Sequence, residues 1–150
     1  MNEDTAIVAV GRAIQLSVAP VFLLSAIGAM LAVMTNRLAR VVDRARRVED
    51  RLASDESTST DRAGAERDLA VMSRRARFIN GAITLCTITA LFVCAVVAAM
   101  FTGAFLGFNA AIPVAVLFVA AMTTFFVGLL FFLREIFLAT ANLRIGGPPR

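Results

Sequence analysis

Two long stretches without a charged residue constrain this chain more than any other feature. The first covers residues 13–36, which is 24 positions, and the second covers residues 78–133, which is 56 positions. A helix needs about 20 apolar residues to cross a bilayer core of about 30 Å. The first stretch therefore predicts one membrane span. The second would make a helix of roughly 84 Å, which no bilayer matches, so the chain must turn back within it.

The turn within the second stretch is marked by residues that disfavour helix. They are Gly103, Gly107, Asn109 and Pro113. We therefore expect two further spans, at about 79–102 and 112–133, with a short turn between them.

A soluble fold is a poor alternative for this composition. The chain is 59% hydrophobic, whereas soluble domains average about 45–50% apolar residues. A chain of 150 residues cannot build a soluble shell around these two stretches. A cleaved signal peptide would carry positive charge before its apolar run. Here the start is acidic and the arginine cluster follows the run, so we expect an uncleaved span.

The distribution of arginine predicts the orientation. All 15 basic residues are arginine, and 14 of them fall in residues 37–77 and 134–150, on one side of the predicted spans. The other side, residues 1–12 and 103–111, has Arg12 alone. Because basic residues near span ends stay inside, we expect the N-terminus outside and the C-terminus in the cytoplasm.

The N-terminal segment leaves two alternatives open. Apolar residues recur at helical spacing before Pro20, and proline disfavours an unbroken helix. We therefore expect residues 5–17 to form a separate interfacial helix on the outer face, and the alternative is one kinked helix that continues into the span.

The segment between the first two spans predicts a helical hairpin. Apolar residues recur about every 3.5 positions in residues 37–53 and again in 65–77, which is the spacing of a coiled-coil seam. The polar, turn-rich residues 54–64 separate the two arms. With two heptads per arm, the hairpin must lean on its continuous membrane helices or on other copies.

The predicted fold is an all-α membrane protein with three transmembrane helices and a cytoplasmic antiparallel helical hairpin extending from spans one and two. The expected segments, in chain order, are the outer N-terminal segment 1–18, first span 19–36, hairpin 37–77, second span 78–102, outer turn 103–111, third span 112–133 and cytoplasmic tail 134–150.

The hairpin carries a set of arginines at helical spacing. Those that we expect to contact lipid or a partner are Arg37, Arg40, Arg44, Arg47, Arg51, Arg74, Arg75 and Arg77. Near an anionic membrane surface each basic residue contributes about 1 kcal/mol. The simpler interpretation is a solvated charged face that sets the topology. Aromatic residues are not interleaved with the arginines, so nucleic-acid binding is not expected.

Three charged residues are candidates for structural ion pairs. Asp43 lies at helical spacing from arginines of its own arm. Arg134 and Glu135 end the third span, where Arg134 can anchor at the interface. We expect Glu135 to pair with the arginine cluster of residues 37–44 at the same depth, which would join the third span to the first.

The spans themselves contain no Asp, Glu, Lys, Arg or His, which argues against a proton-coupled transporter. Small residues form one face of the first span, where helices can approach closely. They are Ser25, Gly28, Ala29 and Ala32. We expect this face to pack within the chain's own bundle, and the alternative is pore lining in an oligomer.

An enzyme is not expected. His, Lys and Tyr are absent, which removes most acid–base residues. A zinc site would need clustered Cys or His. We therefore predict no catalytic residue, no cofactor and no metal.

Three parts of the sequence resemble a bacterial family catalogued as domain of unknown function 2721. They are the runs IQLSVAPVFLLSAIGAML from Ile14, NRLARVVDRARRVE from Asn36 and FLREI from Phe132. The resemblance covers roughly residues 10–145 and implies a three-span protein of the bacterial inner membrane, with no activity to carry over. Positions that match its motif are Arg37, Arg40, Asp43, Arg44, Arg46, Arg134 and Glu135.

Two functions are compatible with these features. One is a structural or interaction protein that self-associates or docks a partner through the cytoplasmic hairpin. The other is a small homo-oligomeric channel with an arginine-lined cytoplasmic vestibule. Few polar residues lie along the first span, which favours the interaction protein. Its expected partners are the bilayer, with anionic lipid at the cytoplasmic face, and other copies of the chain.

Overall fold

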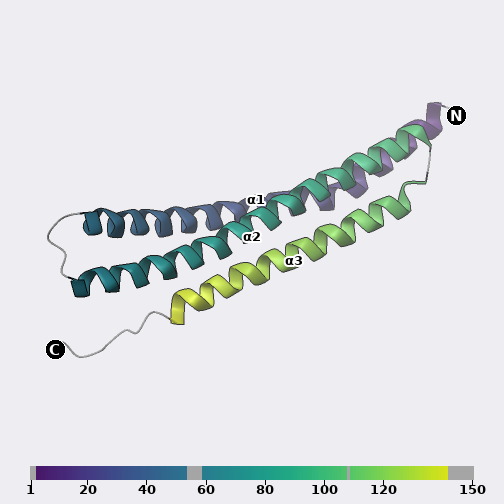
Figure 1. Ribbon diagram of the computed structural model, residues 1–150. Coiled ribbons are helices and arrows are strands. Elements are labelled where there is room, and N and C mark those ends of the chain that lie inside the picture. The colour runs from purple at the N-terminus through teal and green to yellow at the C-terminus, as the bar shows by residue number, and fades with distance from the viewer. Residues whose placement is uncertain (1–2, 54–58, 108, 142–150) are drawn as a thin grey trace. The chain divides into compact units, whose positions relative to one another are not determined.

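The computed structural model describes residues 3–53, 59–107 and 109–141, which form three α-helices and no strand (Figure 1). They are α1 (Glu3–Ala53), α2 (Ser59–Leu106) and α3 (Ala111–Ala141). Each is long and apolar enough to cross a membrane. The prediction of an all-helical chain with three helices of this kind is therefore confirmed.

Helix α1 is continuous through Pro20, over 51 residues. Of the two alternatives for the N-terminal segment, the structure has the single helix, and the separate interfacial helix at residues 5–17 is not formed. A proline inside an apolar helix is tolerated where neighbouring groups replace the missing hydrogen bond. The helix then runs past the apolar stretch because residues 37–53 contain neither glycine nor proline.

The connection between α2 and α3 falls within the predicted turn. Gly107 has a φ of 68°, a left-handed conformation that glycine adopts without steric cost. Its N–H donates to the carbonyl of Gly103 at 3.0 Å, which ends α2. Asn109 Oδ1 accepts the N–H of Ala111 at 3.0 Å, which starts α3. Pro113 sits in the first turn, where its missing N–H costs nothing.

Two helices extend beyond the limits of the predicted spans and arms. Helix α2 already begins at Ser59, so the polar segment between the arms is shorter than residues 54–64, and residues 54–58 lie outside the described part. Helix α3 continues beyond position 133 through Arg134 and Glu135 to Ala141. The reason is that arginine and glutamate are good helix formers, so a helix need not end where the apolar stretch ends.

The chain divides into two compact units. The first, Met1–Leu31 with Thr84–Val127, is called the apolar unit here. The second, Ala32–Ile83 with Gly128–Arg150, is called the arginine-rich unit. Each contains parts of all three helices.

The interior of the apolar unit is made of small and branched side chains. Its buried residues include Ala13, Ile27, Val93, Val96 and Ala121. Its hydroxyl groups bond to their own helices: Thr89 donates to the carbonyl of Leu85 at 2.9 Å, and Ser17 donates to that of Ile14 at 2.9 Å. Because these hydroxyls are satisfied locally, the helices of this unit meet through close packing.

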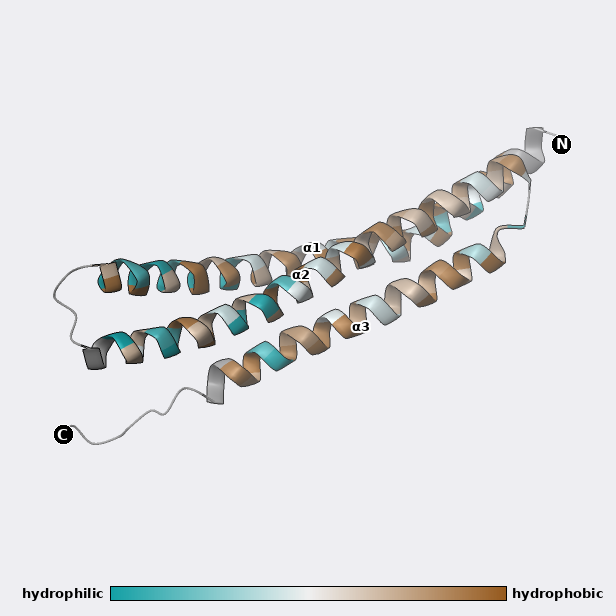
Figure 2. Cartoon of the chain, viewed as in Figure 1, coloured by the Kyte–Doolittle hydropathy of each residue, from teal (hydrophilic) through white to brown (hydrophobic). Residues whose placement is uncertain are grey.

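Large apolar side chains cover the outside of the same unit. Among the most exposed are Phe22, Leu91, Phe105, Ile112 and Phe126, each with 62% or more of its surface accessible. Such a surface suits lipid rather than water. The hydropathy colouring of Figure 2 shows apolar residues along these helices.

In the arginine-rich unit the predicted seam is only partly covered. Leu38, Val41 and Val48 of α1 are half-buried, whereas Met72 and Ile79 of α2 are buried. Figure 2 shows hydrophilic residues gathered over the C-terminal end of α1 and the N-terminal end of α2. Residues 37–53 of α1 therefore keep apolar surface that the single chain does not bury.

Candidate functional site

The carboxylate of Glu135 on α3 is the centre of the arginine-rich unit. Its side chain is fully buried, with none of its surface accessible. Arg75 of α2 donates two hydrogen bonds to the same oxygen, Oε1, from Nη2 at 2.9 Å and from Nε at 3.3 Å. Charge-assisted bonds of this kind are among the strong ones in proteins. This ion pair joins α2 to α3.

A second arginine reaches the other oxygen of Glu135 from α1. Nη2 of Arg37 lies 3.4 Å from Oε2. The contact is an ion pair without the geometry of a hydrogen bond, and Oε2 accepts no hydrogen bond from any described residue. The carboxylate is thus held tightly by Arg75 and loosely by Arg37, which leaves donor groups of Arg37 available to another acceptor.

Aromatic rings contact two arginines of this unit. The guanidinium of Arg37 lies 5.4 Å from the ring centre of Phe132, and that of Arg134 lies 5.8 Å from the ring centre of Phe78. Phe78 and Phe131 meet edge to face at 6.1 Å. These distances are within the range of favourable cation–π and aromatic contacts. The rings of Phe132 and Phe78 therefore contact these two cations directly.

Gly81 lets α2 approach α3 beside these rings. A Cβ atom at this position would lie 3.1 Å from Cδ1 and 3.3 Å from Cε1 of Phe131. Such contacts are tighter than nine in ten Cβ contacts in proteins. A side chain at this position would therefore need Phe131 to shift by a few tenths of an ångström.

The sequence places the three charged residues at one depth. Arg37 directly follows the first charge-free stretch, Arg75 precedes the second by three residues, and Glu135 follows its end by two. A buried carboxylate costs several kcal/mol unless it is paired. Two arginines at the same depth supply that pairing, one from each of the other helices.

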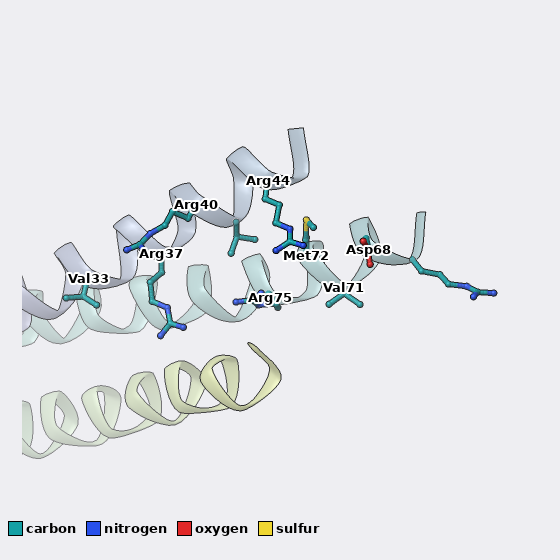
Figure 3. Close-up of a pocket in the computed structure, with 10 residues that line it drawn as sticks. Val33, Arg37, Arg40, Arg44, Asp68, Val71, Met72 and Arg75 are labelled. Carbon is teal, nitrogen blue, oxygen red and sulfur yellow. The ribbon is translucent and has the colours of Figure 1, made fainter. Parts of the chain in front are cut away.

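Next to this ion pair, α1 and α2 form an open groove of about 900 Å³ (Figure 3). It combines five arginines and one aspartate with four apolar side chains. The lining residues are Val33, Arg37, Arg40, Val41, Arg44, Arg67, Asp68, Val71, Met72 and Arg75. The charge of this lining is strongly positive, and we call it the arginine groove.

The cations of the arginine groove differ in what they already bind. Arg37 and Arg75 pair with Glu135. Arg44 and Arg67 have no ion pair or hydrogen bond with another described residue. Figure 3 shows Arg44 extending from α1 toward Met72 of α2. An anion in the groove would therefore meet cations that the described residues leave uncompensated.

The groove includes half of the arginines that the sequence singled out. Arg37, Arg40, Arg44 and Arg75 line it, whereas Arg47, Arg51, Arg74 and Arg77 do not. Nε of Arg40 donates to the carbonyl of Asn36 at 3.3 Å, and Nε of Arg47 donates to that of Asp43 at 3.2 Å.

One arginine of the groove was missed in the sequence. Arg67 lies eight residues before Arg75, a spacing that returns to the same side of a helix after about two turns. This spacing is the sequence feature that could have identified Arg67.

Of the three residues singled out for structural ion pairs, only Glu135 forms one with another described residue. Among the described residues, Asp43 makes no ion pair. Its carboxylate is on an exposed face, where pairing in water contributes little. Arg134 contacts the ring of Phe78 rather than an acid. Glu135 does lie against Arg37, one of the arginines of residues 37–44, and also against Arg75, whose part in this pairing the sequence did not suggest.

The small-residue face of α1 is not packed within the chain. Its four members are exposed, namely Ser25, Gly28, Ala29 and Ala32. A Cβ atom on Gly28 would meet nothing within 4 Å. The prediction that this face packs within the chain's own bundle was wrong, because α2 and α3 contact other faces of α1.

No group of three or more His, Cys, Asp or Glu side chains that could hold a metal ion occurs in the described ranges 3–53, 59–107 and 109–141. Cys86 is buried and Cys94 is exposed, and both are free thiols. The chemistry of the site is therefore that of arginine: charge, directed N–H donors and stacking.

These features define a class of protein: an all-helical chain whose three helices can span a membrane, with a paired buried carboxylate and an arginine groove. The chain belongs to the family described as "Protein of unknown function (DUF2721)", whose family model matches residues 17–145. The resemblance found in the sequence is thus confirmed. No curated protein and no solved structure matches the chain.

Proposed function

We propose that this chain is a multi-pass protein of the bacterial cytoplasmic membrane that works as an interaction protein. Its hairpin, residues 37–77, docks an anionic partner or another copy of the chain. The observation that carries this proposal is the arginine groove, in which five arginines face one aspartate. A surface with such an excess of one charge is suited to a partner of the opposite charge.

The proposed orientation puts the groove in the cytoplasm. It is supported by the arginine count, with 14 of the 15 arginines on the side of the hairpin and the C-terminal tail. A C-terminal green fluorescent protein fusion should therefore fluoresce, and a C-terminal alkaline phosphatase fusion should be inactive. The reverse pattern would contradict the orientation.

The half-covered seam supports docking as well. Leu38, Val41 and Val48 keep part of their apolar surface accessible in the single chain. Burial of apolar surface is the main source of free energy in association. Self-association or partner binding would cover this surface.

Photo-crosslinking in cells tests docking through the hairpin. A photoreactive residue at Val41, which lines the groove, should trap a discrete adduct in the membrane fraction. The matched control is Ala39, which is exposed and two positions away, on the opposite side of α1. Equal trapping at both positions, or trapping at neither, would contradict docking through this surface.

Subunit counting decides between an interaction protein and a channel. Native mass spectrometry of the full chain in lipid nanodiscs should show a monomer or a dimer. A closed ring of four or more copies would instead support a channel and justify flux measurements. The hydroxyls of Thr89, Thr123 and Thr124 bond to carbonyls of their own helices, which does not favour a hydrated pore.

A further inference from the structure

We propose that the arginine groove binds the phosphate headgroup of an anionic phospholipid, and that this lipid competes with Glu135 for Arg37. The inference rests on the proposed function, whose anionic partner it names. It follows from three features of the groove: uncompensated cations, apolar walls and an arginine shared with a buried carboxylate.

The uncompensated cations are Arg44 and Arg67, which have no ion pair or hydrogen bond with another described residue. Arginine presents planar, directed N–H donors that match the oxygens of a phosphate group. With Arg37 beside them, three guanidinium groups line one groove. A phosphate in the groove can therefore accept hydrogen bonds from arginine.

The apolar walls favour a lipid over a free anion. Val33, Val41, Val71 and Met72 line the same groove. Val33 belongs to the charge-free stretch of α1, and Arg37 follows one turn later. The groove thus changes from apolar at its Val33 end to positively charged at its arginines. A phospholipid changes in the same way from its acyl chains to its headgroup. Its volume of about 900 Å³ is within the range of small-molecule sites.

Glu135 limits this site through the arginine that it holds loosely. The ion pair of Arg37 with Oε2 is 3.4 Å long and lacks hydrogen-bond geometry, whereas Arg75 makes two hydrogen bonds to Oε1. Arg37 is therefore the member that a phosphate can draw away. Because coupling between two binding partners is reciprocal, a lipid that takes Arg37 weakens the hold of α1 on α3.

Native mass spectrometry of the full chain in mild detergent tests the site with defined short-chain probes. Dioctanoyl phosphatidylglycerol should bind at one molecule per chain, more tightly than dioctanoyl phosphatidylcholine and more tightly than inorganic phosphate. Binding of phosphatidylcholine at equal strength would overturn the anionic preference. Binding of inorganic phosphate at equal strength would show that the ligand is a free anion rather than a lipid.

A matched pair of variants locates the site. Arg44→Gln removes an exposed arginine that lines the groove, and Arg46→Gln removes another exposed arginine of α1 that does not line it. We expect Arg44→Gln to weaken phosphatidylglycerol binding about fivefold and Arg46→Gln to leave it unchanged. Equal effects of the two variants would overturn the proposal, since they would reflect net charge alone.

Removing the competitor should have the opposite effect. In Glu135→Gln the negative charge is lost but the side-chain oxygen can still accept from Arg75. We expect phosphatidylglycerol to bind several-fold more tightly, with helix content and elution volume unchanged. Weaker binding by a folded variant would overturn the competition. If this variant does not fold, the double variant of Arg37→Gln with Arg44→Gln takes its place. If the double variant loses no more affinity for phosphatidylglycerol than Arg44→Gln alone, Arg37 is not part of the site.

The outcomes separate this inference from the proposed function. If the preference for phosphatidylglycerol is absent but the crosslinker at Val41 still traps an adduct, the occupant of the groove is a protein partner. That result would overturn the lipid site alone. Retained lipid preference without any trapping at Val41 would overturn protein docking and leave the lipid site in place.

Discussion

The two units of this chain hold their helices together by different physical means. The apolar unit contains one arginine in sequence, Arg12, and its described interior consists of small and branched side chains with locally bonded hydroxyls. The arginine-rich unit contains the other 14 arginines, and its described interior includes a fully buried carboxylate paired with two of them. One unit relies on shape and the other on directed charge.

The difference follows from the surroundings that each unit is built for. In lipid there is no hydrophobic drive between helices, so small residues and close packing must bring them together. Near the end of a span, arginines can keep part of their surface in contact with water while they pair. Arg37 and Arg75 do so, with 30% and 24% of their side chains accessible.

The largest expected effect comes from removing the buried carboxylate. Glu135→Ala would leave Arg37 and Arg75 without their shared partner. Breaking a buried pair costs about 3–5 kcal/mol, and we expect about 2–4 kcal/mol here because both arginines stay partly exposed. Reversible unfolding in bicelles would measure it. A variant as stable as the parent chain would show that the unit relies on packing alone.

A smaller effect is expected from filling the space beside Phe131. Gly81→Leu would force α2 away from that ring, and overpacking of this kind costs about 1–3 kcal/mol. The matched control is Gly28→Leu in the apolar unit, where the added side chain meets nothing of its own chain. The same unfolding measurement should show little change for the control. Loss of stability in both variants would mean that Gly28 is covered by another copy.

The next largest effect is expected from the ring of Phe78, which contacts both Arg134 and Phe131. Phe78→Leu keeps the apolar volume but removes the cation–π contact at 5.8 Å and the edge-to-face contact at 6.1 Å. We expect a loss of about 1 kcal/mol. A double-mutant cycle with Arg134→Gln would apportion it. A coupling energy of zero would show that Arg134 only anchors at the interface.

The smallest effect is expected in the apolar unit. Thr89→Val removes a hydroxyl that bonds to the carbonyl of Leu85 in its own helix and reaches no other helix. We expect a change in unfolding free energy of about 0.6 kcal/mol or less. A loss comparable with that of Glu135→Ala would contradict the distinction between the two units.

Much of the helical layout could be predicted because it depends on local composition. The charge-free stretches require three span-length helices, and the residues from Gly103 to Pro113 require a break. The continuity of α1 through Pro20 could not be decided, since proline is compatible with either an end or a tolerated interruption. The end of α3 at Ala141 could not be predicted from hydropathy, because the apolar stretch ends before the helix does.

The candidate site was predictable only in part. The depth of Arg37 and Glu135 follows from their places at the ends of the charge-free stretches. Three other features depend on how each helix is rotated about its axis. They are the ion pair of Arg75 with Glu135, the position of Arg67 in the groove and the exposure of Gly28. The spacing of residues in the sequence defines several faces of similar polarity on each helix. Packing between the helices decides which of these faces meets a neighbour.

The sequence by itself determined the class of fold, three apolar helices with arginine at one end, because hydropathy and charge act position by position. Only the tertiary structure decided that one carboxylate would be shared by arginines from two other helices, and which arginines would remain for a groove. The physical reason is that a buried charge selects its partners by distance and direction, and these are fixed only when the helices pack.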